Sequence, residues 1–184
     1  MKPILFFMMI SADGYYERGP LAIDWHRTDE EFNEFAIAQL DSVDTLLFGR
    51  VTYEGMYSFW ASPQGLTGEP QTAERMNALR KIVFSRTLAR AEWSNTRLER
   101  DAVDAVTKLR AGGGKPAIVL GSSDLAAGLT AHGLIDEYRL MVNPVALGKG
   151  KPVLQGLKGD LALALLSTRT FKNGNVLLSY APRR

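Results

Sequence analysis

The residues with the clearest chemistry lie where apolar runs of this sequence stop. The run Thr45–Phe48 ends at Gly49, and Arg50 and Thr52 follow where a helix should begin. A helix that begins beyond a strand offers unpaired backbone N–H groups and the positive end of its dipole, and glycine lets a ligand approach the backbone closely. The guanidinium of Arg50 and the hydroxyl of Thr52 add donors suited to phosphate. This segment predicts a phosphate-binding loop, with an ordinary solvated connection as the alternative.

The same order of residues recurs later in the chain. The run Ala117–Leu120 enters Gly121, Ser122, Ser123 and Asp124 just before another helix. Backbone N–H groups and the two serine hydroxyls at this point could cradle a pyrophosphate. Ordinary N-capping of the helix by Ser123 or Asp124 would explain the same residues.

A third apolar run also ends in phosphate-type donors. Residues 82–84 lead into Ser85, Arg86 and Thr87. Because parallel strands place their carboxyl ends at one edge of a sheet, three such ends predict a nucleotide that lies across that edge. The charges of Arg50 and Arg86 favour NADP over NAD.

Two acids at the start of a predicted helix are candidates for proton transfer. Thr28 to Glu31 forms a capping-box pattern, with Thr28 as N-cap and Glu31 reaching back to it. At 100° per residue, Asp29 lies roughly 45° from the centre of the apolar stripe that follows, whereas Glu30 points roughly the opposite way. A carboxylate at the mouth of an apolar pocket has a raised pKa and can relay a proton. The alternative is that both acids only complement the helix dipole.

Two further segments carry candidates for the substrate side. Asp13 and Gly14 follow the first apolar run, and form either a plain turn or a loop that contacts substrate. Trp25 and His26 precede the capping-box pattern and could line the pocket of a planar substrate. The alternative for Trp25 is simple packing.

The elements that must position these residues are those of an α/β domain. Continuous apolar runs at Ile4–Ile10 and at the three strands above fit strands that are covered on both faces. Helical spacing is predicted after Thr28, over 101–110 and over 124–132. The last third differs: 134–144 reads as a strand, and 161–171 and 176–181 flank the turn at Asn173-Gly174, which predicts an antiparallel hairpin. The Pro- and Gly-rich stretch 62–71 is predicted to be a surface loop.

Composition predicts one globular domain over residues 1–184 that binds a small molecule. Apolar residues make up 46% and charged residues 23%, which are ordinary values. A net charge of +2 without a basic run argues against nucleic acid. The chain has no cysteine, and its two histidines are far apart in sequence, so we expect no metal centre. The first apolar run is too short to span a membrane, and we read it as the first strand of a cytoplasmic protein.

Several of these segments, taken in order, resemble the dihydrofolate reductase-like fold, above all the reductase domain of the bifunctional riboflavin-pathway deaminase-reductase. The resemblance covers nearly the whole chain and rests on 4–14, 49–54, 82–86, 119–125 and 133–152. The most specific part is Gly-Leu-Ile-Asp-Glu at 133–137 with Pro-Val-Ala-Leu-Gly-Lys-Gly-Lys-Pro at 144–152. Two departures leave the substrate open. Serines replace the glycines that dihydrofolate reductases keep at 122 and 123, and 54–57 lacks the Asp-Asn-Pro stretch usual in the riboflavin enzyme.

The resemblance implies a three-layer α/β fold with a mixed, mainly parallel sheet of about eight strands. It implies NADPH along the strand ends, with the pyrophosphate at the turn of residues 121–123 and the 2′-phosphate near Arg50, Thr52, Ser85 and Arg86. Asp124 and Leu125 would open the helix beside the pyrophosphate. Asp29 or Glu30 stands where dihydrofolate reductases keep their active-site acid, and the substrate residues implied are Asp13, Trp25 and Tyr53. A homodimer is expected by the same analogy.

These observations predict a stand-alone NADPH-dependent reductase. Hydride would pass to a small heterocycle of pteridine or ribosylaminopyrimidine type, as in 5-amino-6-(5-phosphoribosylamino)uracil reductase or dihydrofolate reductase. The alternative from another class is a catalytically inactive NADP(H)-binding domain with a regulatory or interaction role. A binding protein without any nucleotide is least supported, because three strand ends carry the phosphate pattern.

Overall fold

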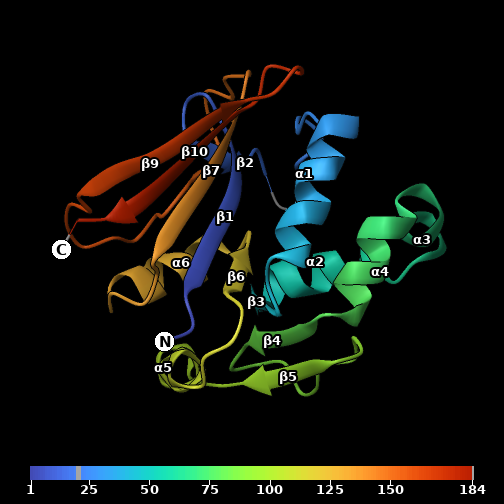
Figure 1. Cartoon of the computed structure of the whole chain (residues 1–184), viewed down its shortest axis with the longest axis vertical. Helices are drawn as coiled ribbons and strands as arrows, with labels where there is room; N and C mark the ends of the chain where they lie inside the picture. Colours follow the sequence, from blue (N-terminus) through green and yellow to red (C-terminus); the bar gives the residue numbers. More distant parts are fainter. Residues whose placement is uncertain (20–21, 184) are drawn as a thin grey trace.

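The computed structural model of the chain describes residues 1–19 and 22–183, and it shows a twisted sheet with helices on both faces (Figure 1). The strands are β1 (Ile4–Ser11), β2 (Tyr15–Glu17), β3 (Thr45–Gly49), β4 (Arg80–Phe84), β5 (Thr96–Glu99), β6 (Ala117–Leu120), β7 (Glu137–Asn143), β8 (Lys151–Pro152), β9 (Leu163–Thr170) and β10 (Val176–Pro182). The helices are α1 (Glu30–Asp41), α2 (Arg50–Trp60), α3 (Pro63–Gly68), α4 (Pro70–Ala78), α5 (Ala102–Ala111) and α6 (Ser123–Thr130).

The main sheet has eight strands in the order β5-β4-β3-β6-β1-β7-β10-β9. The first six in this order run parallel, and β10 runs antiparallel to both β7 and β9. The predicted mixed, mainly parallel sheet with an antiparallel finish is therefore confirmed. The hairpin also turns where the sequence predicts it, and Gly174 adopts a φ of 90° that favours glycine. A separate small ribbon pairs β2 with β8.

The two faces of the sheet bury separate cores. Helices α1, α2 and α4 pack on one face, and α5 and α6 pack on the other. Side chains alternate along β1, so Leu5, Phe7 and Met9 enter the first core while Ile4 and Phe6 enter the second. This confirms that the continuous apolar runs are strands covered on both faces. No helix within 1–19 or 22–183 is long and apolar enough to cross a membrane.

The prediction of a surface loop over 62–71 is wrong. Helices α3 and α4 occupy this stretch, and each begins with a proline, Pro63 and Pro70. Proline suits the first helical position, where its missing N–H is not needed and its fixed φ is already helical. The side chain of Ser62 caps α3 by accepting the N–H of Gly65. The prolines thus mark the starts of helices rather than a loop.

The capping-box prediction is also wrong. Asp29, not Thr28, is the N-cap of α1, and its carboxylate accepts the N–H of Phe32 at 2.9 Å. Glu31 does not reach back along its own helix. Its carboxylate instead accepts the N–H of Lys172 at 2.9 Å and lies 3.1 Å from the guanidinium of Arg169. A tertiary contact with the hairpin therefore replaces the local one.

A largely buried ion pair joins the amino ends of β1 and β7 to the end of α5. Nη1 of Arg110 lies 2.5 Å from Oδ2 of Asp136, and Nη2 lies 3.0 Å from Oδ1. Nη1 also donates to the carbonyl of Leu134, and Oδ2 of Asp136 accepts the N–H of Ile4, both at 2.8 Å. The side chains are 10% and 26% exposed. The aspartate of the Gly-Leu-Ile-Asp-Glu segment thus has a structural role, because it joins β1, β7 and α5.

Candidate cofactor and substrate site

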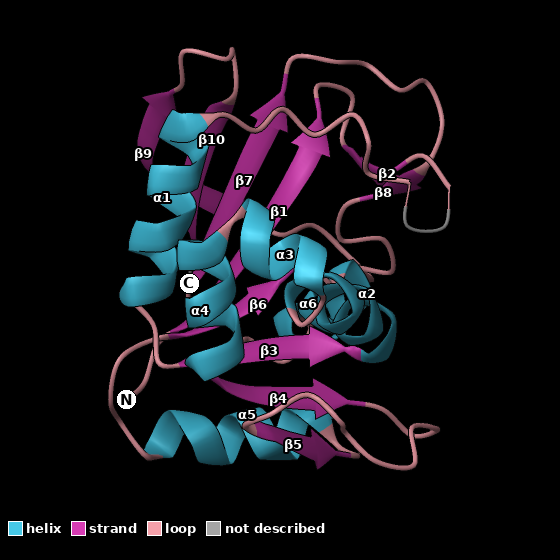
Figure 2. Ribbon diagram, turned by 90° about the vertical axis from the view of Figure 1, so that its right-hand side faces the viewer, coloured by secondary structure: helices cyan, strands magenta, loops and turns pink. Residues whose placement is uncertain are grey.

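The first two predicted phosphate loops lie side by side. Strands β3 and β6 are neighbours in the sheet, and α2 and α6 begin directly beyond their carboxyl ends, on the right of the sheet (Figure 2). Gly121 has a φ of 63°, and a Cβ built on it would lie only 3.1 Å from Cγ2 of Thr52. The two loops therefore lie close together, and a side chain at residue 121 would be strained and would have to displace Thr52.

The helices that begin here lack side-chain caps. The side chains of Asp29, Ser62 and Asp101 cap α1, α3 and α5, whereas no side chain of the described residues caps α2, α4 or α6. Of these three helices, α2 and α6 begin at the ends of neighbouring strands. The leading N–H groups of a helix have no partner within the helix and attract anions when nothing caps them. Two such ends at neighbouring strands form a site suited to a pyrophosphate.

The serines of the second loop are used differently from either sequence interpretation. Ser122 is the N-cap of α6 in the left-handed conformation, with φ 55°, and its Oγ accepts the N–H of Gly49 at 2.9 Å. Ser123 is buried, and its Oγ accepts the N–H of Leu154 at 2.7 Å. Neither hydroxyl caps the helix. Ser122 joins the two phosphate loops, and Ser123 anchors the loop after β8. Asp124 is exposed at the same helix end.

Leu125 completes the second loop and packs partly buried against the core that α5 and α6 cover. Its backbone N–H remains a candidate for the cofactor, because it lies in the first turn of α6.

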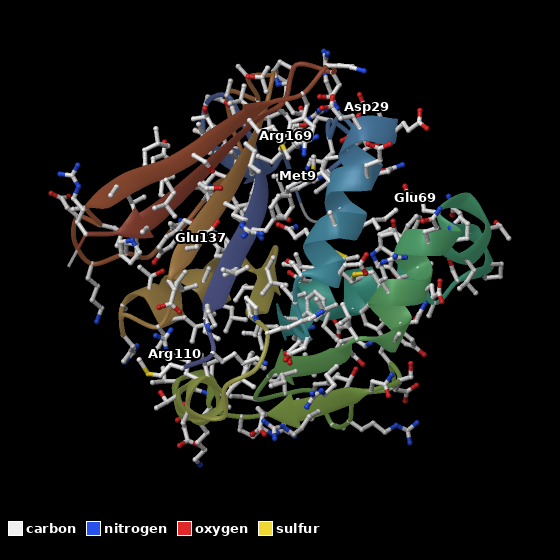
Figure 3. All side chains as sticks on the ribbon, in the orientation of Figure 1. Met9, Asp29, Glu69, Arg110, Glu137 and Arg169 are labelled. Atoms are coloured by element: carbon white, nitrogen blue, oxygen red, sulfur yellow. The ribbon has the colours of Figure 1, made fainter. Side chains whose placement is uncertain are left out.

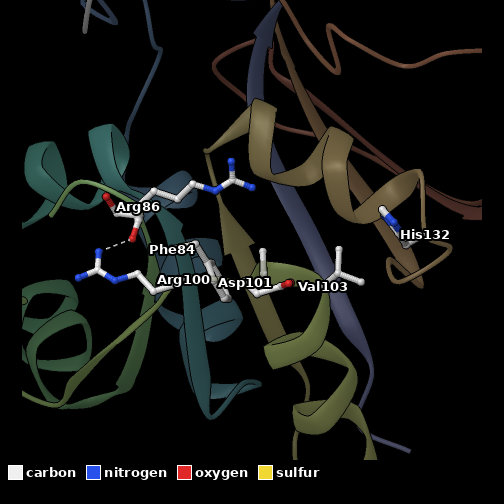
Figure 4. A pocket seen from close by; sticks show the side chains of 8 residues that line it. Phe84, Arg86, Arg100, Asp101, Val103 and His132 are labelled. Atoms are coloured by element: carbon white, nitrogen blue, oxygen red, sulfur yellow. Dashed lines mark hydrogen bonds between the residues drawn. The ribbon is translucent and has the colours of Figure 1, made fainter.

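The third predicted loop borders a hollow of about 580 Å³ beyond β4 and β5 (Figure 4). Its lining residues are Phe84, Ser85, Arg86, Arg100, Asp101, Ala102, Val103 and His132. Ser85 turns its hydroxyl inward to its own loop, where it accepts the N–H groups of Thr87 and Leu88. Strand β5, which brings Arg100 to this hollow, was not foreseen from sequence. Its only signal is the short alternation Thr-Arg-Leu-Glu.

The two arginines predicted for the phosphate differ in their surroundings. Nη1 of Arg50 lies 2.9 Å from Oε2 of Glu54, one helical turn on. Within the described residues, Arg86 has no hydrogen bond or ion pair through its side chain, and Figure 4 shows that side chain extending away from Arg100 toward α6. Arg86 is therefore the cation more available to a ligand.

The two candidate acids lie at the start of α1. Figure 3 shows Asp29 at this end of the helix and Met9 between β1 and α1. The N–H of Arg27 donates to Oδ1 of Asn143 at 2.8 Å, which places the segment before α1 at the carboxyl end of β7. Asp29 is half-buried and caps its helix, whereas Glu30 is exposed. Of the two, Asp29 is the better placed to face a ligand at the strand ends.

Asp13 holds the loop that follows β7. Its carboxylate accepts the hydroxyl of Ser11 at 2.6 Å and the N–H groups of Leu147 and Gly148 at 3.0 and 2.7 Å. These hydrogen bonds, that of Ser11 foremost, lower the pKa of Asp13 to about 2. A carboxylate with this pKa is a poor proton donor near neutrality. Asp13 therefore acts at most as a fixed anion beside a substrate, and the Pro-Val-Ala-Leu-Gly motif supplies its partners.

The aromatic candidates are packed into the protein. Tyr53 is 3% exposed, and its hydroxyl accepts the N–H of Trp93 at 2.8 Å. Trp25 is 8% exposed, donates from Nε1 to the carbonyl of Ala22 at 3.2 Å and packs edge-on against His26 with centroids 4.5 Å apart. The placement of Trp25 agrees with its packing alternative, and the roles of Trp25 and Tyr53 toward a substrate stay predictions. No group of three or more metal-ligating side chains occurs among the described residues.

The burial of His26 gives the fold a pH dependence. Its Nε2 is buried and has no hydrogen-bond partner among the described residues, and burial lowers the pKa of His26 to about 4, an effect that the carboxylate of Asp24 offsets only in part. Between pH 6.5 and 4 the imidazole of His26 is protonated in the unfolded chain but stays neutral in the folded chain. The free energy of unfolding should therefore fall by about 2 kcal/mol between pH 7.5 and 5.

Urea unfolding of the wild type and of His26→Gln at pH 7.5 and 5 measures this effect. His26→Gln should lose most of the fall, and the exposed His132→Gln serves as the matched control that keeps it. An equal fall in wild type and His26→Gln would assign the pH dependence to other groups.

Comparisons with known proteins identify the family and the fold of this chain. The model of the RibD C-terminal domain matches residues 2–177. The uncharacterized protein YyaP of Bacillus subtilis (strain 168) is 28% identical over 181 residues, which cover 97% of this chain and 94% of that protein. A structure from Shewanella sp. PV-4, provisionally named a riboflavin biosynthesis protein, superposes with a TM-score of 0.75 at 22% identity over 99% of both chains. Dihydrofolate reductase from Enterococcus faecalis, complexed with NADP(H) and RAB-propyl, superposes with a TM-score of 0.67 at 13% identity, over 99% of this chain and 97% of that one. The fold is thus dihydrofolate reductase-like, and the chain belongs to the RibD C-terminal domain family.

Proposed function

We propose that this protein is an NADPH-dependent reductase of a small heterocyclic substrate. The observation that carries the proposal is the pair of uncapped helix ends, α2 and α6, at the carboxyl ends of adjacent parallel strands. That arrangement suits a pyrophosphate. Family membership and a dihydrofolate reductase-like neighbour complexed with NADP(H) support the same cofactor.

Residues of this chain fit the pyrophosphate and the adenosine end of NADPH. The first-turn N–H groups of α2 and α6 would hold the pyrophosphate, and Gly121 would let it approach the backbone. The hollow beyond β4 and β5 would take the adenosine end, with Arg86 on the 2′-phosphate. In this placement Arg50 assists from the start of α2, with part of its charge compensated by Glu54.

The substrate would lie on the face of the sheet that α1 covers. Phe7, Met9 and Leu120 on central strands each keep 8 to 9% of their surface exposed on this face, and would form an apolar floor. The cofactor, when bound, supplies a hydride to an electron-poor carbon of the substrate. Asp29, or water that it holds, would deliver the matching proton at the adjacent nitrogen. A planar heterocycle of pteridine or ribosylaminopyrimidine type fits such a floor, because a flat ring buries well against apolar side chains.

A second candidate function is an NADP(H)-binding domain without turnover. It is favoured by one specific observation: Oδ1 of Asp29 is already engaged as the cap of α1. NADPH binding without oxidation in the presence of any pteridine or ribosylaminopyrimidine would support it, whereas NADPH consumption abolished by Asp29→Asn would exclude it.

The available cation, Arg86, should set the preference for NADPH. Replacing Arg86 by alanine removes the guanidinium proposed to meet the 2′-phosphate, and should weaken NADPH binding roughly ten- to hundred-fold while leaving NADH nearly unchanged. Arg50→Ala is the matched control and should have a smaller effect, because Glu54 already engages that side chain. Titrations that follow NAD(P)H fluorescence measure both constants. A larger loss in Arg50→Ala than in Arg86→Ala would reverse the assignment.

The expected homodimer and cytoplasmic location stay predictions. An edge strand offers unpaired backbone groups to a second copy, and β9 is such a strand, with Leu165 and Leu166 58% and 56% exposed. If the homodimer forms, we expect it to use this edge.

A further inference from the structure

Arg100 holds the turn that carries Arg86. Nη1 of Arg100 donates to the carbonyl of Ser85 at 2.6 Å and to the carbonyl of Leu88 at 2.8 Å. Figure 4 shows the first of these bonds beside the hollow. One guanidinium nitrogen therefore bridges the first and last residues of a four-residue turn, and fixes the two ends relative to each other.

The same turn is closed from within by Ser85. Its Oγ accepts the N–H of Thr87 at 3.2 Å and the N–H of Leu88 at 2.9 Å. The N–H of Ser85 donates to the carbonyl of Glu99 at 3.1 Å, which ties the turn to β5 just before Arg100. All these bonds use groups other than the side chain of Arg86. The turn is thus ordered while that one cation stays free.

From this arrangement we infer that Arg100 is a positioning residue for NADPH specificity. Nη1 of its guanidinium is occupied by two backbone carbonyls, which fixes the side chain against the turn. Its role is to present Arg86 to the hollow with the turn already ordered, so that less conformational entropy is lost when the 2′-phosphate binds. This inference rests on the proposed function. It assigns the discrimination between NADPH and NADH to Arg86, which contacts the 2′-phosphate, and to Arg100, which acts through Arg86.

The test compares Arg100→Met with Arg97→Met. Methionine keeps an unbranched apolar stem beside the hollow but cannot bridge the carbonyls. Arg97 lies on β5, three residues before Arg100, in an exposed ion pair with Glu99, and its replacement should leave the binding of both cofactors unaffected. For Arg100→Met we expect NADPH affinity to fall about ten-fold and NADH affinity to change less than about two-fold, measured by fluorescence titration.

The double variant Arg86→Ala/Arg100→Met decides between positioning and direct contact. If Arg100 acts through Arg86, the double variant should bind NADPH no more weakly than Arg86→Ala alone. Additive losses would mean that Arg100 itself contacts the phosphate, and equal losses of NADPH and NADH would mean a merely structural role. Either result overturns the inference.

Amide hydrogen exchange of Thr87 and Leu88 without nucleotide keeps this test separate from the proposed function. These two N–H groups should exchange faster in Arg100→Met than in wild type, and Arg100→Lys should restore part of the protection because an ammonium can still reach a carbonyl. Unchanged exchange would refute the positioning role even if NADPH binds. Faster exchange in a protein that binds neither cofactor would instead refute the proposed function and leave the turn as described.

Discussion

Replacing Gly121 by valine should abolish measurable NADPH binding while the fold survives. Gly121 adopts a φ of 63°, which a β-branched residue rarely takes, and even its first added carbon would lie 3.1 Å from Cγ2 of Thr52. The valine side chain would therefore push apart the two loops at the ends of β3 and β6. Because the proposed site needs both helix ends at one pyrophosphate, we expect at least a hundred-fold loss of affinity in a fluorescence titration, about 3 kcal/mol or more.

Two companion variants separate the causes of this loss. Gly121→Ala adds only the carbon that meets Thr52, so the double variant Gly121→Ala/Thr52→Ser, which removes that methyl group, should recover part of the affinity lost in Gly121→Ala. Gly128→Ala is the matched control, because a Cβ at this helical glycine meets nothing within 4 Å, and alanine should stabilise α6 by about 0.5 to 1 kcal/mol. Full NADPH affinity in folded Gly121→Val would show that the two loops are not the pyrophosphate site.

Replacing Arg110 by methionine should produce the largest loss of stability among single changes outside the site. The carboxylate of Asp136 would remain largely buried without its guanidinium partner, and the carbonyl of Leu134 would lose a donor. Removing one partner of a buried pair costs about 3 to 5 kcal/mol, because the charge that stays buried loses its oppositely charged neighbour. Urea unfolding at pH 7 should show the loss as a lower midpoint with an unchanged slope.

The double variant Arg110→Met/Asp136→Asn tests that cause. Asparagine removes the stranded charge yet keeps an oxygen for the N–H of Ile4, so the double variant should be clearly more stable than Arg110→Met. Lys108→Met breaks an exposed ion pair with Asp104 on the same helix, and it should change nothing measurable. If the double variant were the less stable of the two, the loss in Arg110→Met would come from packing of the arginine stem instead.

The sheet could be predicted from sequence because its strands have clear sequence patterns. Runs such as Ile4–Ile10 are apolar without alternation, which is what burial on both faces requires, and each parallel run ends in a polar loop. Carboxyl ends of parallel strands share one edge, so the meeting of Gly49 and Gly121 also followed from the pattern. The helices at 62–71 could not be predicted in this way, because proline is common both in turns and at the first position of helices. Only the packing of α3 and α4 decides between the two.

The finer chemistry of the site depended on contacts that no local pattern contains. Oγ of Ser122 accepts the N–H of Gly49, which is 73 residues away in the sequence, and the carboxylate of Asp13 accepts the N–H of Gly148, which is 135 residues away. One signal was available in the sequence: Arg50 and Glu54 are four residues apart on a helix, a spacing that pairs opposite charges. It distinguishes Arg50 from Arg86, whose side chain has no hydrogen bond or ion pair among the described residues.

The position of β6 between β3 and β1 also has a consequence for folding kinetics. The chain completes β1 and β3 long before it supplies β6, so these early strands have no common neighbour until residues 117–120 insert between them. Closing so long a loop is slow, because its entropy is lost before the contacts compensate for it. The joint between Gly49 and Ser122 can form only after that insertion. A nucleotide that binds this joint therefore recognises only the fully assembled sheet, and its binding should slow global unfolding without accelerating the early steps of folding.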